Sequence, residues 1–253
     1  MNFNLLSIVF SVCLLVSSTA SAQELLPWKQ DIKIDASFVD WQEDSLRYFY
    51  EEQGLKYAIS NDESYLYIFI KVPHQGQQLK AIYNGFNITI SESPKEESGS
   101  SVIFPLPDKA ALQAVNAETN FEKAANRRQF GLETIRAIYV RGFDEIVDGM
   151  ISIRNTYGVK PAIRIDSSDV LNYELAIPLN KLKIDTNTSF AINLRINEII
   201  TTRYTDPGFR RYRYGYPYYG RSPYGLTRPR SGISRKEVPG VWHTVKLASH
   251  SSQ

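Results

Sequence analysis

One stretch of the chain, residues 57–72, limits the fold more than any other. Two β-rich runs flank the polar cluster at 60–64, where Asn and Asp favour a tight turn because their side chains bond to nearby backbone amides. After this turn, aromatic and aliphatic residues alternate from Tyr65 to Ile70, so both faces of the strand are apolar. Such a strand has to be covered on both sides, which predicts a β-sandwich or a similar layered fold.

Further segments alternate in the same way and extend the prediction to the rest of the chain. Strands are expected at 32–34, 86–90, 102–104, 151–153, 162–165, 173–177, 190–196 and 241–247. Residues 77–83 fit a turn or a short helix, and residues 132–140 fit neither the strand nor the helix period well. The Ala-rich composition from Asp108 to Arg128 favours a helix with Asp108 as its cap.

No flexible linker or internal repeat divides the chain after residue 22. The expected fold class is therefore all-β: a single antiparallel β-sandwich, jelly-roll or immunoglobulin-like, over residues 23–253. Two insertions interrupt it, one short and helical at about 106–130, the other a long Tyr/Arg/Gly/Pro loop at about 203–236.

The first 22 residues have the pattern of a signal peptide. An apolar run from Ser7 to Val16 precedes Ala20-Ser21-Ala22, which fits the small-x-small rule for cleavage, so the mature chain is expected to begin at Gln23. The alternative, a retained membrane anchor, is disfavoured because the run is shorter than the roughly 20 residues that a span needs. The prediction is a periplasmic or extracellular protein without a transmembrane segment in its mature form. Cys13, the single cysteine, would leave with the signal, which excludes disulfides and cysteine metal sites.

The Tyr/Arg loop is the compositional anomaly of the chain. Residues 210–225 contain six tyrosines and four arginines, and no acidic residue occurs from Pro207 to Lys236. A solvated loop, a sugar-binding surface and a nucleic-acid-binding segment all fit this composition. Export disfavours nucleic acid, whereas an anionic polysaccharide would match the charge.

Residues with catalytic or metal-binding potential form no recognisable motif. The three histidines are scattered, and neither a nucleophile elbow nor a Gly-rich phosphate loop occurs. His243 is interpreted as a surface residue of the last strand. Asp35, Asp40 and Asp62 are expected to cap turns, with structural calcium as the alternative and no other cofactor. The sequence predicts a protein that is not an enzyme.

The order of several short motifs resembles that of the family 9 carbohydrate-binding module-like (DOMON-related) domains of exported bacterial proteins. The matching segments are Ile34-Asp35, Asp40-Trp41, 58–62 with 66–68, 173–179, 191–197, and Trp242 with 245–247. The resemblance implies a β-sandwich that binds sugars, often between aromatic rings, and in some members structural calcium; others bind haem or have no known ligand. Trp41 and Trp242 match positions that look structural in the family, which leaves Trp28 as the spare tryptophan.

Since no tryptophan pair remains to clamp a sugar, tyrosines of the loop are the candidate replacement. The function expected is that of an exported, non-catalytic binding module for carbohydrate or an anionic polysaccharide. The alternative is a structural or protein-interaction scaffold of the bacterial cell envelope without a sugar ligand. The candidate ligand-binding residues are Tyr212, Tyr214, Tyr216, Tyr218, Tyr219, Arg211 and Arg213.

Overall fold

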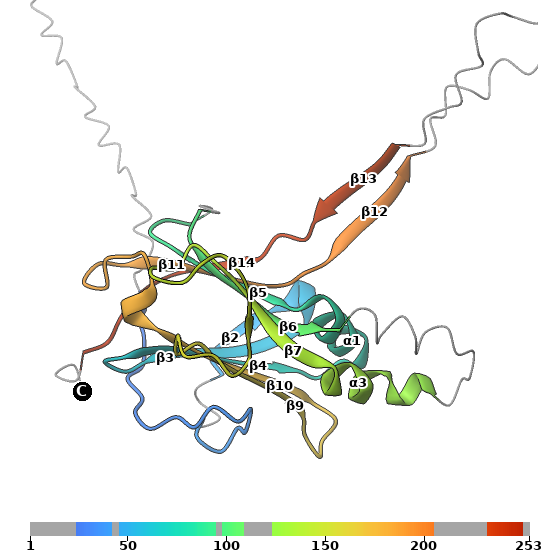
Figure 1. Ribbon diagram of the computed structural model, residues 1–253, viewed down its shortest axis with the longest axis horizontal. Helices are drawn as coiled ribbons and strands as arrows, with labels where there is room; N and C mark the ends of the chain where they lie inside the picture. Colours follow the sequence, from blue (N-terminus) through green and yellow to red (C-terminus); the bar gives the residue numbers. More distant parts are fainter. Residues whose placement is uncertain (1–23, 42–45, 95–97, 109–122, 205–231, 250–253) are drawn as a thin grey trace, which may run out of the picture.

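The computed structural model describes residues 24–41, 46–94, 98–108, 123–204 and 232–249. Within these ranges the strands form two packed sheets and a separate hairpin, as Figure 1 shows. The all-β sandwich predicted from the sequence is confirmed.

The larger sheet has seven strands in the described part of the chain, in the order β1-β14-β11-β5-β6-β7-β8. Its strand pairs are antiparallel except for β1 with β14, which is parallel. The strand bounds are β1 Glu24–Leu25, β5 Phe86–Ser91, β6 Ser100–Pro107, β7 Ile135–Arg141, β8 Gly149–Ser152, β11 Phe190–Ile196 and β14 Val241–Lys246.

The smaller sheet has five described strands in the order β2-β3-β4-β10-β9, all antiparallel. Their bounds are β2 Tyr48–Tyr50, β3 Leu55–Asn61, β4 Tyr65–Val72, β9 Lys160–Ile165 and β10 Leu171–Pro178. Short 3-10 turns, η2 Glu51–Gln53 and η3 Leu179–Lys181, follow β2 and β10.

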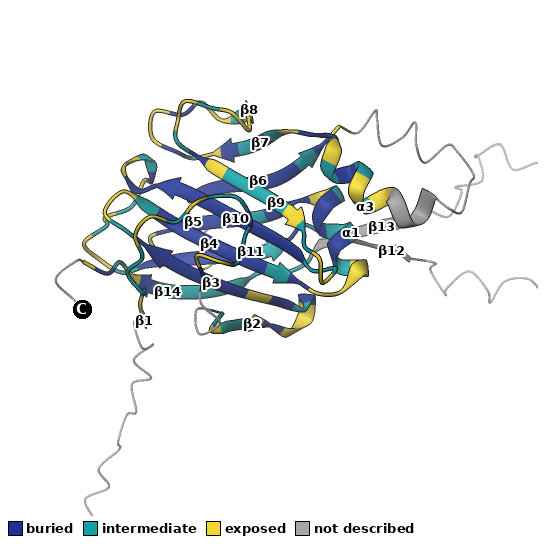
Figure 2. Cartoon of the chain, turned by 90° about the horizontal axis from the view of Figure 1, so that it is seen from below, coloured by how far each residue is buried: buried dark blue, intermediate teal, exposed yellow. Residues whose placement is uncertain are grey.

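The two α-helices of the described residues lie at one end of the sandwich, α1 at Gln75–Asn84 and α3 at Lys123–Glu133 (Figures 1 and 2). Helix α1 occupies the range that the sequence left open between a turn and a helix. The described part of the predicted helical insertion is helical from Lys123, while residues 109–122 lie outside the described residues. The ambiguous range 132–140 divides into the end of α3 and strand β7.

Strand β4 is covered on both faces, as its apolar pattern predicted. Leu66, Ile68 and Ile70 point into the main core between the sheets, and each has no exposed surface. On the opposite face, Tyr67 and Phe69 belong to a second apolar cluster with Trp41. Figure 2 shows the buried residues running along the central strands of both sheets.

The N-terminal segment before β2 covers that second apolar cluster. Residues 32–34, expected to form a strand, are irregular, with Ile32 and Ile34 half-buried against the cluster. The strand prediction was wrong because the backbone turns beside them, with Asp31 and Ala36 at positive φ. The alternating pattern reflected packing against the outer face of a sheet.

A buried carboxylate attaches this segment to the sandwich. Glu174 of β10 has no exposed surface and accepts hydrogen bonds from the backbone N–H groups of Asp35 (2.9 Å) and Ala36 (2.8 Å) and from Trp41 Nε1 (2.8 Å). The neighbouring motifs Ile34-Asp35 and Asp40-Trp41 therefore meet the motif at 173–179, which is far away in the sequence, at one structural contact.

Tyr173, the neighbour of Glu174, points into the main core, and its hydroxyl has no hydrogen-bond partner among the described residues. Replacing Tyr173 with Phe is expected to raise the free energy of unfolding by about 1 kcal/mol, because a buried unsatisfied hydroxyl costs stability. Tyr57→Phe is the matched control: this tyrosine is equally buried, but its hydroxyl bonds to His243, so its loss should destabilise. Urea unfolding would measure both, and destabilisation by Tyr173→Phe would contradict the assignment.

Candidate functional site

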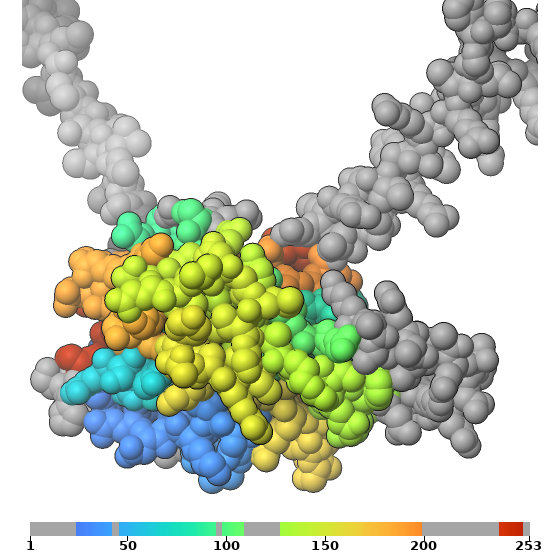
Figure 3. Space-filling view, in the orientation of Figure 1, coloured from blue at the N-terminus to red at the C-terminus, as the bar shows by residue number. Residues whose placement is uncertain are grey.

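An open groove of about 840 Å³ lies at the end of the sandwich opposite the α-helices. Four segments form it: the β3–β4 turn, the chain from η3 to β11, the chain from β1 to Trp28, and the end of β14 with the residues after it. Figure 3 shows the β3–β4 turn in cyan, the chain from η3 to β11 in orange and the end of the chain in red close together at the left end of the molecule.

Trp28 reaches the groove because the chain crosses there from one sheet to the other. Leu26 N–H bonds to the carbonyl of Lys246 (2.9 Å), continuing the pairing of β1 with β14 in the larger sheet. Two residues later Trp28 forms an isolated bridge with Asn61, the last residue of β3 in the smaller sheet. Trp28 is half-buried at this crossing.

Asn61 joins two walls of the groove. Its buried amide donates to the carbonyl of Ala248 (3.0 Å), and its Oδ1 accepts the N–H of the same residue (2.9 Å). The residues after β14 are thereby held against the end of β3, so two walls of the groove are joined by a reciprocal pair of hydrogen bonds. Such a groove is largely formed before a ligand arrives.

Asp62 begins the β3–β4 turn and caps it, as predicted. Its Oδ1 accepts the N–H groups of Ser64 (2.7 Å) and Tyr65 (2.6 Å), and its Oδ2 accepts the Tyr67 hydroxyl (2.6 Å). Asp35 also caps a turn, because its Oδ1 accepts the Ser37 N–H (2.8 Å). Asp40 instead accepts the N–H of Lys33, seven residues earlier in the chain (3.1 Å). In the described ranges, no three His, Cys, Asp or Glu side chains lie close enough to share a metal ion.

The groove combines an apolar floor with a polar rim. Leu179 and Leu182 are buried beneath it and Ile184 is half-buried, whereas the rim residues Glu63, Asn180, Asn187, Lys246 and Ser249 are exposed. An aromatic ring beside hydrogen-bonding side chains suits a ligand with one apolar face and several hydroxyl groups. Among the groove-lining residues, the sequence singled out Trp28 as the spare tryptophan, but no pattern marked the residues between η3 and β11.

The seven predicted ligand-binding residues, Arg211, Tyr212, Arg213, Tyr214, Tyr216, Tyr218 and Tyr219, lie outside the described residues. The hairpin that flanks them, β12 (Ile199–Tyr204) and β13 (Gly232–Glu237), projects from the opposite end of the sandwich from the groove (Figure 1). Strand β11 runs between the two ends, and its seven residues span about 20 Å. The base of the hairpin and Trp28 are therefore not parts of one site.

His243 points inward, which corrects its interpretation as a surface residue. It shares a face of β14 with the core residue Val245, and its Nε2 is hydrogen-bonded to the Tyr57 hydroxyl. The Tyr48 ring lies 4.7 Å from the imidazole, centroid to centroid. Burial lowers the pKa of His243, and the nearby Glu24 carboxylate opposes this shift.

This burial predicts a pH dependence of stability. Because the folded pKa lies below the ordinary value of 6.5, the unfolded chain binds a proton that the folded chain lacks, so stability falls as pH drops from about 6.5 towards the folded pKa. His243→Gln should reduce this loss. Melting temperatures between pH 7.5 and 5 would show it as a shallower slope in the variant, and equal slopes would contradict it.

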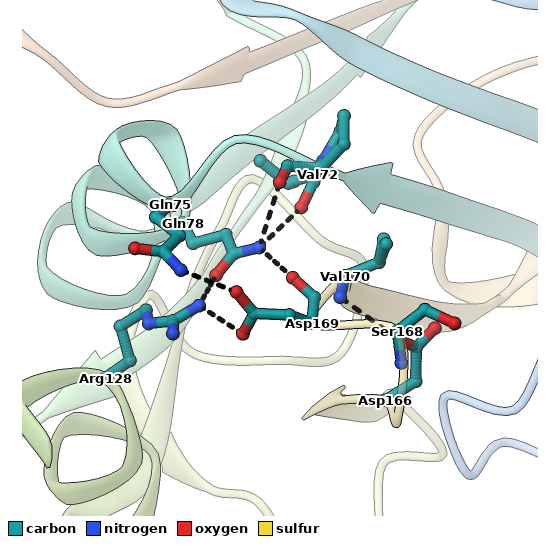
Figure 4. Close-up of polar contacts among 9 residues, drawn as sticks. Val72, Gln75, Gln78, Arg128, Asp166, Ser168, Asp169 and Val170 are labelled. Atoms are coloured by element: carbon teal, nitrogen blue, oxygen red, sulfur yellow. Dashed lines mark hydrogen bonds and ion pairs between the residues drawn. The ribbon is translucent and has the colours of Figure 1, made fainter. Parts of the chain in front are cut away.

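A second polar cluster connects the helices to the sandwich (Figure 4). The buried Gln78 amide of α1 donates to the carbonyls of Val72 (2.9 Å) and Asp169 (2.7 Å), and its Oε1 accepts from Arg128 of α3. Arg128 also bonds to the Asp169 carboxylate (2.7 Å), which accepts a further bond from Gln75 (2.6 Å). These groups are bonded to one another, so the cluster is structural.

None of the described helices is long and apolar enough to cross a membrane. No protein-family model matches this chain, and a search of curated proteins found none significantly similar to it.

Proposed function

We propose that the mature chain is an exported, non-catalytic binding module for carbohydrate, and that the groove beside Trp28 is its binding site. The groove carries this proposal: a tryptophan, an apolar floor and exposed hydrogen-bonding groups converge at one end of a rigid sandwich. The C–H face of a pyranose ring can stack on an indole ring, while its hydroxyl groups bond to carboxylate and amide side chains. The signal-like residues 1–22 support export.

The rival proposal is a structural or interaction scaffold of the cell envelope. A scaffold would have the same sandwich fold, but its groove would have no affinity for sugars. The projecting β12–β13 hairpin favours it, because an extended element of this kind can engage another envelope component.

Trp28→Ala is expected to weaken glycan binding by about 30-fold, since removing a central tryptophan from a binding site costs about 2 kcal/mol. A glycan array with residues 23–253 would first identify a ligand, and calorimetry would then compare the variants. Phe49→Ala removes an aromatic side chain that is 59% exposed and outside the groove, and should bind as the intact chain does. If no glycan is bound while a known module binds in the same assay, the scaffold is favoured.

A further inference from the structure

The charged side chains of the groove indicate the kind of saccharide it takes. Its titratable lining residues are Asp62, Glu63 and Lys246, so two carboxylates stand against one ammonium group. Asp62 lies at the base of the β3–β4 turn with both carboxylate oxygens bonded, and Glu63 is exposed at the same turn. A uronate or sulfate entering the groove would approach both carboxylates.

The floor also disfavours an anionic ligand. Leu179 and Leu182 are at most 8% exposed and provide no hydrogen-bond donor from their side chains. A charged group placed against them would lose hydration without gaining a partner, which is costly. Acidic groups are usually recognised by planar, multi-donor arginine side chains, and the residues that line this groove include none.

We infer that the groove selects an uncharged saccharide. This inference rests on the proposed function and adds the ligand class. Trp28 stacks on the C–H face of a sugar ring, the exposed Glu63 carboxylate accepts hydrogen bonds from hydroxyl groups, and Asn180 and Lys246 donate to others. The groove and residues 207–236 are therefore assigned different ligand classes. Residues 207–236 contain arginine and lack acidic residues, a composition that suits an anionic ligand.

The test measures the binding affinity of the protein for neutral and for acidic saccharides at two salt concentrations. Calorimetry would titrate residues 23–253 with neutral gluco-, xylo- and manno-oligosaccharides, and with polygalacturonate and a sulfated polysaccharide, at 0.05 and 0.5 M NaCl. Binding of the uncharged saccharide should change less than about twofold with salt, because no ion pair across the interface is there to be screened. Trp28→Ala should weaken that binding at least tenfold, and Glu63→Lys should weaken it while raising affinity for polygalacturonate.

The wild-type protein gives a second readout if Trp28→Ala does not fold. The indole N–H resonance of Trp28, assigned with Trp28→Phe, should shift on addition of the neutral saccharide, while that of the buried Trp41 should not. Binding of acidic polysaccharides alone, with a shift of the Trp28 resonance, would overturn the inference and leave the groove as a glycan-binding site. Acidic binding without that shift would overturn the groove as the binding site. Absence of binding to both classes would overturn the proposed function itself.

Discussion

Replacing Glu174 with glutamine is expected to lower the free energy of unfolding by about 3 kcal/mol, and the melting temperature by roughly 6–12 °C for a domain of this size. The carboxylate accepts three N–H donors in a fully buried position. A glutamine amide has only one acceptor oxygen, so its NH₂ group would face either the Trp41 indole N–H or the backbone amides of Asp35 and Ala36. Thermal unfolding followed by circular dichroism would measure the change.

Two further variants separate this contact from a general effect of substitution. Trp41→Phe keeps a ring against Phe69 but loses the indole donor, so it should cost about 1–2 kcal/mol, and the double variant should cost less than the sum of the two. Glu92→Gln, at an exposed position, should change stability by less than about 0.5 kcal/mol. A melting temperature of Glu174→Gln equal to that of this control would contradict the role assigned to the carboxylate.

Burial of Glu174 also makes folding stability depend on pH, with a sign opposite to that of the His243 contribution. Burial raises the pKa of Glu174 above the ordinary 4.5, although the N–H donors of Trp41, Ala36 and Asp35 lower it. Between 4.5 and the folded pKa the folded chain binds a proton that the unfolded chain lacks, so this group's contribution to stability falls as pH rises through that window. The glutamine variant should lack this component, and the difference between its stability–pH curve and that of the intact chain isolates it.

The sandwich could be predicted from the sequence because side-chain alternation directly reports which faces of a strand are buried. Strand β4 shows this most clearly, since its aromatic residues and its aliphatic residues face two different apolar clusters. The same rule failed at Ile32-Lys33-Ile34, where the alternating apolar residues pack on a sheet without joining it. Alternation indicates burial, whereas strand pairing also needs a neighbouring edge with free backbone groups.

The groove was less accessible to prediction because its walls come from segments that are far apart in the sequence. Trp28, Asn61 and Lys246 meet only after the chain has crossed between the sheets, and no spacing in the sequence encodes that crossing. His243 was misinterpreted for a related reason. The polar character of a histidine suggests the surface, but its partner, the Tyr57 hydroxyl, lies on the facing sheet.

Removing residues 208–226 is expected to leave the sandwich folded and to abolish binding to acidic polysaccharides. The pairing of Tyr204 with Gly232 holds together the two chain ends that flank the segment, and residues 205–207 and 227–231 would still join them. A shorter loop costs slightly less entropy to close, so stability should change by less than about 0.5 kcal/mol. The deletion removes six tyrosines and the arginines at 210, 211, 213 and 221, the groups suited to a polyanion.

A Gly/Ser replacement of the same 19 positions, 208–226, is the matched control, because it preserves the length of the connection while removing its side chains. Both variants should lose salt-sensitive binding to polygalacturonate and to a sulfated polysaccharide, and both should retain any saccharide bound beside Trp28. Retained polyanion binding at unchanged stability would show that these tyrosines and arginines bind no polyanion. Loss of the cooperative unfolding transition in the Gly/Ser variant would instead show that these side chains stabilise the sandwich. Side chains that only bind a ligand can be replaced without unfolding the two sheets.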